Sequence, residues 1–187
     1  EGQVTVDGKR RDLPRPFFVV ATQNPTDFHG TYPLPEAQLD RFAVRVTLGY
    51  PDLPHEMEIL YGQSREHPFD SLQPVISGAD VLRLQGQVRE VRVDRALAEY
   101  ILRLVDWTRA DPRIRLAVSP RGSLTLFRTA QARALTEGRD YVLPDDIHAL
   151  AAPVLAHRMM LDTKAKYGGV SGVQLIEEAL GKVPVPR

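Results

Sequence analysis

The sequence contains no cysteine among its 187 residues. Disulfide bonds and thiolate metal sites are therefore excluded, and the absence fits a reducing compartment. No apolar run is long enough to cross a bilayer, and no charged segment followed by an apolar one opens the chain. We therefore expect a cytoplasmic protein without membrane contact.

An excess of either charge is also missing, because 24 basic and 24 acidic side chains cancel to a formal net charge of zero. A protein that binds nucleic acid through its phosphates usually carries a basic excess. The balance argues against a general nucleic-acid binder, although a local basic patch would be compatible with it. Hydrophobic residues make up 43% of the chain and charged residues 26%, which is typical of folded rather than disordered proteins.

The sequence lacks a phosphate-binding loop of the G-x-x-x-x-G-K-[ST] type. Its two Gly-Lys pairs stand at residues 8–9 and 181–182, and the positions five residues before their glycines hold Gln3 and Ile176. No apolar strand ends in an Asp-Glu pair that could hold Mg²⁺, and the five histidines show no metal-ligand spacing. We therefore predict no metal site in this chain, and no site for the β- and γ-phosphates of a nucleotide.

The first third of the chain has the pattern of an incomplete α/β domain. Residues 3–11 alternate around an Asp-Gly pair, which predicts a β-hairpin because both turn positions need a positive φ. The apolar run 17–22 predicts a strand buried on both faces, and the alternating residues 42–48 predict a second strand. Between them, Pro35 and Glu36 predict the start of a short helix. Two strands and a hairpin cannot form a stable sheet alone, so the pattern implies further strands upstream.

The rest of the chain has helical periodicity. Helices are predicted over residues 54–64 and 77–90, from Asp94, from Ser119 and from Pro144, and a last amphipathic helix contains residues 177–178. The residues expected to face inward are Leu97, Ile101, Leu104 and Val105, then Leu124, Phe127 and Ala134, then Ile147, Leu150, Ala151 and Val154. The predicted fold is an α/β piece over residues 1–66, comprising the end of a parallel sheet and a hairpin, followed by an all-α bundle over residues 67–187. The molecule should be mostly helical.

Three polar residues occupy positions where a ligand could bind. Asn24 follows the carboxyl end of a buried-type strand, where open α/β sheets bind ligands, although Asn-Pro also forms ordinary turns. Arg121 lies in the first turn of the helix after Ser119, where a cation is unfavourable by about 0.3–1 kcal/mol unless an anion compensates it. A bound phosphate would compensate it, as would a carboxylate partner or exposure to solvent. Arg41 ends the short helix, where the dipole favours a cation without any function.

Residues 30–42, GTYPLPEAQLDRF, together with residues 18–25, FVVATQNP, closely resemble the MoxR family of AAA+ ATPases. Further similarity lies in EGQVTVDG at residues 1–8, SPRG at 119–122, DYVLPDDI at 140–147 and VPVP at 183–186. The resemblance covers essentially the whole chain. It identifies the two pieces as the C-terminal part of an AAA+ core and a helical lid domain. The chain departs from the family at Phe28-His29 and in lacking the Walker A and Walker B segments, which the family carries further upstream.

The resemblance implies a role for each of the three polar residues. Asn24 resembles sensor 1, which orients the attacking water near the γ-phosphate. Arg41 resembles the arginine finger, which reaches the nucleotide of the neighbouring subunit and stabilises transition-state charge. Arg121 resembles sensor 2, which contacts the γ-phosphate from the lid. Asn24 and Arg41 are thus the expected catalytic residues and Arg121 the expected nucleotide-binding residue, while the hairpin resembles one that often faces the central pore of the ring.

The same resemblance implies that the intact protein hydrolyses ATP with Mg²⁺, forms a homo-oligomeric, hexameric ring, and remodels or activates partner proteins like a chaperone. Partners with von Willebrand factor A domains are implied in the same way. The chain alone is expected to be inactive, because the phosphate-binding loop is missing. Two alternatives stay open: a non-catalytic assembly module that supplies Arg41 in trans, and an AAA+ motor acting on DNA. The zero net charge and the lack of aromatic residues in basic surroundings argue against the second.

Overall fold

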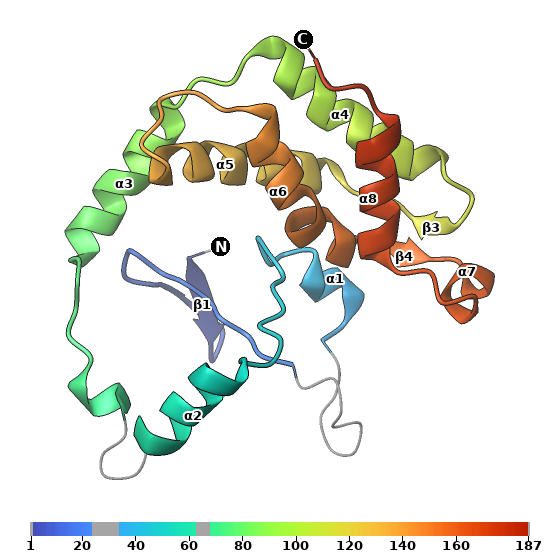
Figure 1. The fold of residues 1–187 in the computed structure, drawn as a ribbon. Coiled ribbons are helices and arrows are strands. Elements are labelled where there is room, and N and C mark those ends of the chain that lie inside the picture. Colours follow the sequence, from blue (N-terminus) through green and yellow to red (C-terminus); the bar gives the residue numbers. More distant parts are fainter. Residues whose placement is uncertain (1, 24–33, 63–67, 187) are drawn as a thin grey trace. The chain divides into compact units, whose positions relative to one another are not determined.

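The computed structural model describes residues 2–23, 34–62 and 68–186, and these are mostly helical with a few short strands, as the sequence predicts (Figure 1). Asn24 and the domain boundary between residues 66 and 67 lie outside the described residues, so both stay predictions. The chain divides into two compact units. The first consists of Glu1–Phe18 and Val46–Leu84, and the second of Val19–Arg45 and Gln85–Arg187.

A β-hairpin opens the first unit. Strands β1 (Gln3–Val6) and β2 (Lys9–Asp12) pair in antiparallel orientation. The turn residues Asp7 and Gly8 have φ angles of 50° and 73°. The Asp-Gly pair predicts both positive values, because a two-residue turn of this kind matches the twist of its strands. The predicted hairpin is therefore confirmed.

Helical segments make up the rest of the first unit. They are α2 (Leu53–Gly62), the 3₁₀ helix η1 (Pro68–Ser71) and the first part of α3 (Gly78–Glu90), which continues into the second unit. The predicted helices near residues 54 and 77 are thus present. No described residue of this unit is buried, and α2 exposes most of its apolar side chains. The described part of this unit therefore has no hydrophobic core of its own.

The two strands predicted at residues 17–22 and 42–48 are wrong. Both segments are free of strand pairing, and Phe18 is 85% and Leu48 97% exposed. A strand is stabilised by ladder hydrogen bonds to a neighbour and by burial of its faces. Within the described residues, the strands form only two antiparallel pairs, β1 with β2 and β3 with β4, and neither pair hydrogen-bonds with these segments. The end of a parallel sheet is accordingly not formed.

The second unit contains the hydrophobic core. Four helices surround it: α4 (Arg95–Ala110), α5 (Pro120–Thr136), α6 (Pro144–Leu155) and α8 (Gly172–Lys182). Helix α6 packs against both α5 and α8, and α4 packs against the same two helices (Figure 1). The largest fully buried side chains include Leu104, Leu126, Ile147, Leu155 and Ile176, which come from all four helices. The predicted helical bundle is confirmed.

The boundaries of these helices follow from local signals. Asp94 caps α4 as predicted, because its carboxylate accepts a hydrogen bond of 2.7 Å from the backbone N–H of Ala96. Gly138, with φ 72°, stands just after α5. One predicted core position is wrong: Leu124 is 59% exposed, and α5 instead buries Leu126 and Ala130. The buried face of α5 repeats every four residues, and Leu124 lies two residues out of phase with it.

Several short elements complete the second unit. Helix α1 (Glu36–Leu39) begins one residue after Pro35 and agrees with the short helix predicted there. The 3₁₀ helix η2 (Ala156–Arg158) directly follows α6. The remaining elements were not predicted, and they are the paired strands β3 (Ile114–Leu116) and β4 (Met160–Leu161) and the helix α7 (Thr163–Tyr167). They are too short to leave a periodic pattern in the sequence.

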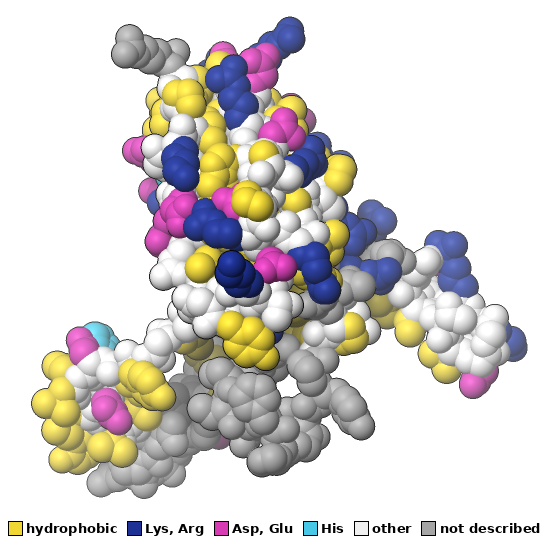
Figure 2. All heavy atoms as spheres, turned by 90° about the vertical axis from the view of Figure 1, so that its right-hand side faces the viewer, with side chains coloured by type: hydrophobic (Ala, Val, Ile, Leu, Met, Phe, Trp, Pro, Cys, Tyr) yellow, Lys and Arg dark blue, Asp and Glu magenta, His cyan; other side chains and the backbone are white. Residues whose placement is uncertain are grey.

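Charges of both signs are mixed on the surface. Figure 2 shows Lys and Arg side chains interspersed with Asp and Glu over the face in view, in keeping with the balanced composition. Some form exposed pairs within one helix, such as Arg95 with Glu99 in α4, and such pairs stabilise a fold only slightly. Among the described residues, no helix is both long and apolar enough to span a membrane.

A buried carboxylate holds the start of α6. Asp146 is 2% exposed and accepts hydrogen bonds from Nη1 and Nη2 of Arg139, at 2.8 and 2.7 Å, and from the backbone N–H of Leu143, at 2.8 Å. Nε of Arg133 lies 3.4 Å from the same carboxylate. Burial alone would raise the pKa of Asp146, but these hydrogen bonds and charges outweigh it and lower the pKa. The ionised carboxylate therefore stabilises the fold above about pH 4, and its contribution is lost as the pH falls through the lowered folded-state pKa.

Replacing Asp146 with alanine should lower the free energy of unfolding by about 3–5 kcal/mol at pH 7, because Arg139 would lose the carboxylate that compensates its charge. Asp145→Ala is the matched control. Asp145 stands in the same helical turn but is exposed, so its loss should cost at most about 1 kcal/mol. Urea denaturation measures both variants. The deficit of Asp146→Ala should shrink below about pH 4, and a deficit that stays constant there would contradict the assigned role.

Candidate functional site

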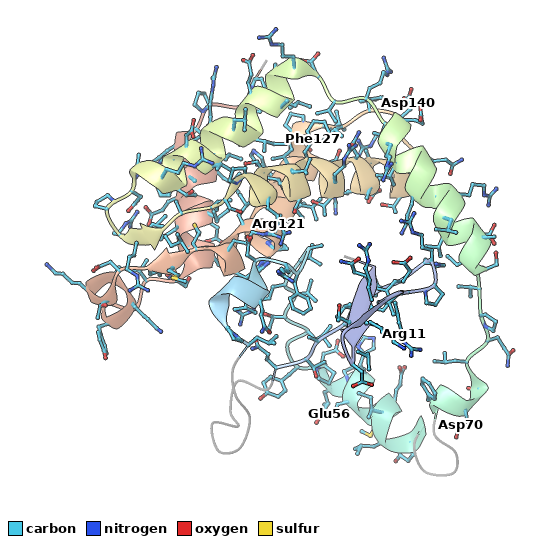
Figure 3. All side chains as sticks on the ribbon, turned by 180° about the vertical axis from the view of Figure 1, so that it is seen from behind. Arg11, Glu56, Asp70, Arg121, Phe127 and Asp140 are labelled. Atoms are coloured by element: carbon cyan, nitrogen blue, oxygen red, sulfur yellow. The ribbon has the colours of Figure 1, made fainter. Side chains whose placement is uncertain are left out.

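The second unit brings two of the three candidate segments together. Helix α1 leads directly into Asp40 and Arg41, and α5 begins at Pro120 and carries Arg121 in its first turn. In Figure 3 the labelled Arg121 side chain comes from the end of α5 that lies beside α1. Both guanidinium groups are on exposed residues. Asn24 lies outside the described residues, so the structure says nothing of its place relative to them.

Arg158, at the end of η2, lies between these segments. Its side chain is only 1% exposed, and every nitrogen of its guanidinium has an acceptor. Nε donates to Oδ1 of Asp40 at 3.2 Å, and Nη1 donates to the carbonyl of Val154 at 2.7 Å. Nη2 donates to the carbonyls of Asp40 and Phe42, at 3.3 and 2.5 Å. A buried cation needs such a complete set of acceptors, because burial without them would cost several kcal/mol.

The end of α6 also binds the segment that follows Arg41. The backbone N–H of Arg45 donates to the carbonyl of Pro153 at 2.9 Å. Carbonyls in the last turn of a helix need donors from outside the helix, and here Arg45 and Arg158 provide them. His157 adds a contact of 3.2 Å from Nε2 to the carbonyl of Phe42. Residues 40–45 are thus fixed along the end of α6 by three separate donors.

The surroundings of His157 favour the neutral ring. Burial lowers the pKa of His157, the hydrogen bond to the Phe42 carbonyl opposes that effect, and the positive charge of Arg158 lowers the pKa further. Only a ring with hydrogen on Nε2 can donate to a carbonyl, so Nδ1 carries the lone pair. Nδ1 is buried and makes no hydrogen bond. A neutral ring would add no second positive charge beside Arg158.

The first turn of α5 is electropositive. Ser119 is its N-cap, but the hydroxyl makes no cap hydrogen bond to the helix. The hydroxyl lies 3.4 and 3.5 Å from the two carboxylate oxygens of Asp40, at the long end of hydrogen bonding. The turn contains no acidic residue, and it carries Arg121. Burial lowers the pKa of Arg158, the Asp40 carboxylate opposes this, and the charge of Arg121 adds to the lowering. One guanidinium pairs with the Asp40 carboxylate, and the second stands close enough to disfavour the charge of the first. An added phosphate at this helix start would stabilise the arrangement.

A glycine permits the close packing of this turn. A Cβ atom on Gly122 would lie 2.4 Å from Cγ1 of Val118, 3.2 Å from Cδ of Arg158 and 3.6 Å from Cδ2 of Leu155. No side chain fits at the first of these distances without displacement of its neighbour. The first turn of α5 therefore rests directly on η2 and the end of α6.

Asp40 and Arg158 were not identified as site residues from the sequence. Asp40 is part of the segment 30–42, but no pattern in the sequence marks it as a site residue beside Arg41. Arg158 carried a usable signal, since it follows the largely apolar run 150–157 and precedes Met159 and Met160. Arginine is almost never fully buried unless it is paired, so a basic residue in such surroundings indicates a partnered, buried cation. The sequence does not identify its partners Asp40 and Phe42, because they lie more than a hundred residues away.

Metal ligation has no candidate in the described part of the chain, where no three His, Asp or Glu side chains lie close enough together to hold an ion. The residues described around Arg121 and Arg158 are suited to an anion. Their donors are guanidinium groups and the start of a helix, and these recognise phosphate or carboxylate oxygens.

Two family models match the sequence. The AAA lid domain matches residues 107–179, and the ATPase family associated with various cellular activities (AAA) matches residues 1–44. These matches include Arg121 and Arg158 in the first case and Arg41 in the second.

Several known proteins are similar over the whole chain. The protein YeaC of Bacillus subtilis (strain 168) is 50% identical over 186 residues, covering 100% of this chain and 58% of its own length. Chaperone MoxR1 of Mycobacterium tuberculosis is 36% identical, covering 100% of this chain and 52% of its own length. A crystal structure of a proposed ATPase from Cytophaga hutchinsonii superposes with a TM-score of 0.90 at 37% identity, covering 100% of this chain and 59% of that one. The chain thus spans between half and three fifths of the length of these proteins.

Gly122→Ala should lower the free energy of unfolding by about 1–3 kcal/mol, because the new methyl group would overlap Val118 and press on Arg158. Gly86→Ala in α3 is the control. No atom lies within 4 Å of a Cβ at that position, so alanine should stabilise the helix by up to about 1 kcal/mol. Thermal or urea denaturation distinguishes the two. A stabilising effect of Gly122→Ala would contradict the close approach of α5 to η2.

Proposed function

Because this chain belongs to the MoxR family of AAA+ ATPases, as a C-terminal portion with a helical lid, we propose that the full-length protein hydrolyses ATP to remodel or activate partner proteins. One observation carries the proposal. The segment of Arg41 and the helix start of Arg121 are joined through Arg158 in an electropositive site. The family generally uses ATP with Mg²⁺, which would bridge phosphate oxygens and neutralise charge.

Arg121 is proposed as the sensor that contacts the γ-phosphate. Its position in the first turn of α5 is unfavourable for a cation, and Arg158 nearby makes it more so. A negatively charged phosphate would remove both penalties and receive hydrogen bonds from the guanidinium. The electrostatics therefore support binding of an anion more than they support a purely structural arginine.

Arg41 is proposed as the arginine finger that acts on the nucleotide of a neighbouring subunit. Its residue is exposed, while the backbone on both sides is fixed by Arg158. An exposed cation on a fixed backbone can reach a second subunit with little loss of backbone freedom. Asn24 is proposed as sensor 1 on the resemblance of its segment alone.

Ring assembly is also proposed, because an arginine finger needs a neighbour to act on. A homo-oligomeric ring, with six subunits by analogy with the family, has the same head-to-tail interface throughout. The chain exposes apolar side chains over α2 and at residues 17–20, and surfaces of this kind are usually covered in the working protein. We propose that the further residues of the full-length protein cover them. A cytoplasmic location and partners with von Willebrand factor A domains belong to the same proposal.

In the full-length protein, Arg41→Ala should reduce the rate of ATP turnover by about 10³-fold or more while nucleotide affinity changes little, because a finger acts mainly on transition-state charge. Arg103→Ala, at an exposed position of α4, is the control and should keep normal turnover. Steady-state hydrolysis and equilibrium titration with a non-hydrolysable analogue measure the two quantities. Loss of affinity in a normally assembled Arg41→Ala protein would contradict the assigned role.

The 187-residue chain alone should neither hydrolyse ATP nor bind its analogue with micromolar affinity, because it contains no phosphate-binding loop. Titration calorimetry with the isolated chain provides the measurement, and the full-length protein is the positive control. Micromolar binding by the chain alone would contradict the proposed division of the site. An assembled full-length protein that binds no nucleotide would instead favour the non-catalytic module that supplies Arg41 in trans.

A further inference from the structure

The two residues that flank Arg41 are both held by one side chain. Arg158 donates to the carboxylate and the carbonyl of Asp40 and to the carbonyl of Phe42. The backbone directly before and after Arg41 is therefore attached to the same buried guanidinium. Any shift of Arg158 must move the point from which the Arg41 side chain extends.

The same side chain supports the first turn of α5. Cδ of Arg158 lies 3.2 Å from where a Cβ of Gly122 would be, so the helix start rests on the Arg158 side chain. Ser119 completes the connection on the other side, where its hydroxyl contacts the Asp40 carboxylate. In the sequence, Arg121 lies between Ser119 and Gly122. Residues 40–42, the first turn of α5 and the end of α6 thus pack together around Arg158.

We propose that Arg158 is a positioning residue that couples the phosphate contact at Arg121 to the placement of Arg41 in the same subunit. The inference rests on the proposed function, in which Arg121 serves the subunit's own nucleotide and Arg41 serves the neighbour's. The state of one nucleotide site then sets the geometry of the finger for the next site. Communication around the ring therefore passes through Asp40, Arg158 and Gly122.

The charges determine which nucleotide state strengthens the contact between Arg158 and Asp40. Arg121 and Arg158 repel each other, and the repulsion disfavours the buried charge of Arg158. A phosphate bound at Arg121 would neutralise one partner of this repulsion and strengthen the hold of Arg158 on Asp40. Loss of the phosphate would restore the repulsion and weaken that hold. The effect of one site on the other is then a coupling free energy, which must be equal in both directions.

Arginine is required here for its shape as well as its charge. The guanidinium reaches a carboxylate and three carbonyls from three nitrogens that point in different directions. A lysine has a single nitrogen and cannot satisfy these acceptors together. Arg158→Lys therefore keeps the positive charge and most of the apolar stem but loosens the segment of Arg41.

The test uses the assembled full-length protein. Arg158→Lys should lower ATP turnover roughly 10- to 100-fold, as expected for a misplaced catalytic group, while affinity for a non-hydrolysable analogue changes less than about twofold. Asp40→Asn, at a side chain that is 31% exposed, is a milder second variant that should show a smaller loss of the same kind. Arg95→Lys in an exposed pair of α4 is the matched control and should leave turnover unchanged. Normal turnover of Arg158→Lys would overturn the proposal.

Mixing of subunits separates positioning of the finger from damage to the subunit's own site. The companion subunit keeps Arg41 and Arg158 but carries glutamine in place of the Walker B glutamate, so it still binds ATP but does not hydrolyse it and is inactive alone. In equal random mixture with Arg158→Lys subunits, turnover should recover to about a quarter of the wild-type value, since one head-to-tail interface in four combines a working site with a working finger. A purely structural role for Arg158 predicts no recovery, and that result would overturn the proposal.

The same mixture made with Arg41→Ala subunits keeps the two proposals distinguishable. Recovery there but not with Arg158→Lys subunits would refute the positioning role and leave the finger role intact. No recovery with Arg41→Ala subunits would refute the finger role itself. Amide exchange gives an independent measure, because the N–H of Arg45 should exchange faster in Arg158→Lys while the core amides of α4 and α8 stay protected. Unchanged exchange at Arg45 would argue against the loosened segment.

Discussion

A guanidinium that is almost completely buried constrains the second unit more than any other group described. Arg158 cannot be buried unless acceptors surround it, because an uncompensated charge would cost several kcal/mol. The end of α6 supplies one carbonyl, and the segment after α1 supplies a carboxylate and two more. The path of residues 40–45 therefore depends on Arg158, and so does the approach of α5 through Gly122.

This dependence explains why the two residues proposed to have separate tasks are found together. Arg41 and Arg121 are 80 positions apart in the sequence, and neither is buried. They are carried by backbone segments that meet on Arg158, so their relative placement is decided in the interior and not at the surface. A site built in this way can keep these two cations exposed while the backbone segments that carry them stay fixed.

Local features were readable from the sequence, and features that depend on distant partners were not. The hairpin turn at Asp7 and Gly8, the cap at Asp94 and the end of α5 at Gly138 each depend on a few neighbouring residues. The strands predicted at 17–22 and 42–48 depend on neighbouring strands that the described residues do not provide. Arg121 could be placed in its helical turn, but Arg158 could not be linked to Asp40 and Phe42, which precede it by more than a hundred residues. Leu124 shows the remaining error, a helix assigned correctly with its buried face rotated.

The contact of Ser119 with Asp40 leaves helix α5 without a side-chain cap. A serine at the start of a helix normally caps it, and a missing cap weakens a helix by about 0.5–2 kcal/mol. Here the hydroxyl turns to Asp40, and the next residues are a proline and an arginine where acidic side chains would suit the dipole. Helix α5 thus begins without a side-chain cap and with a cation in its first turn, although Pro120 at its first position suits a helix start. If Arg121 has the proposed role, this turn exchanges some helix stability for the placement of a phosphate contact.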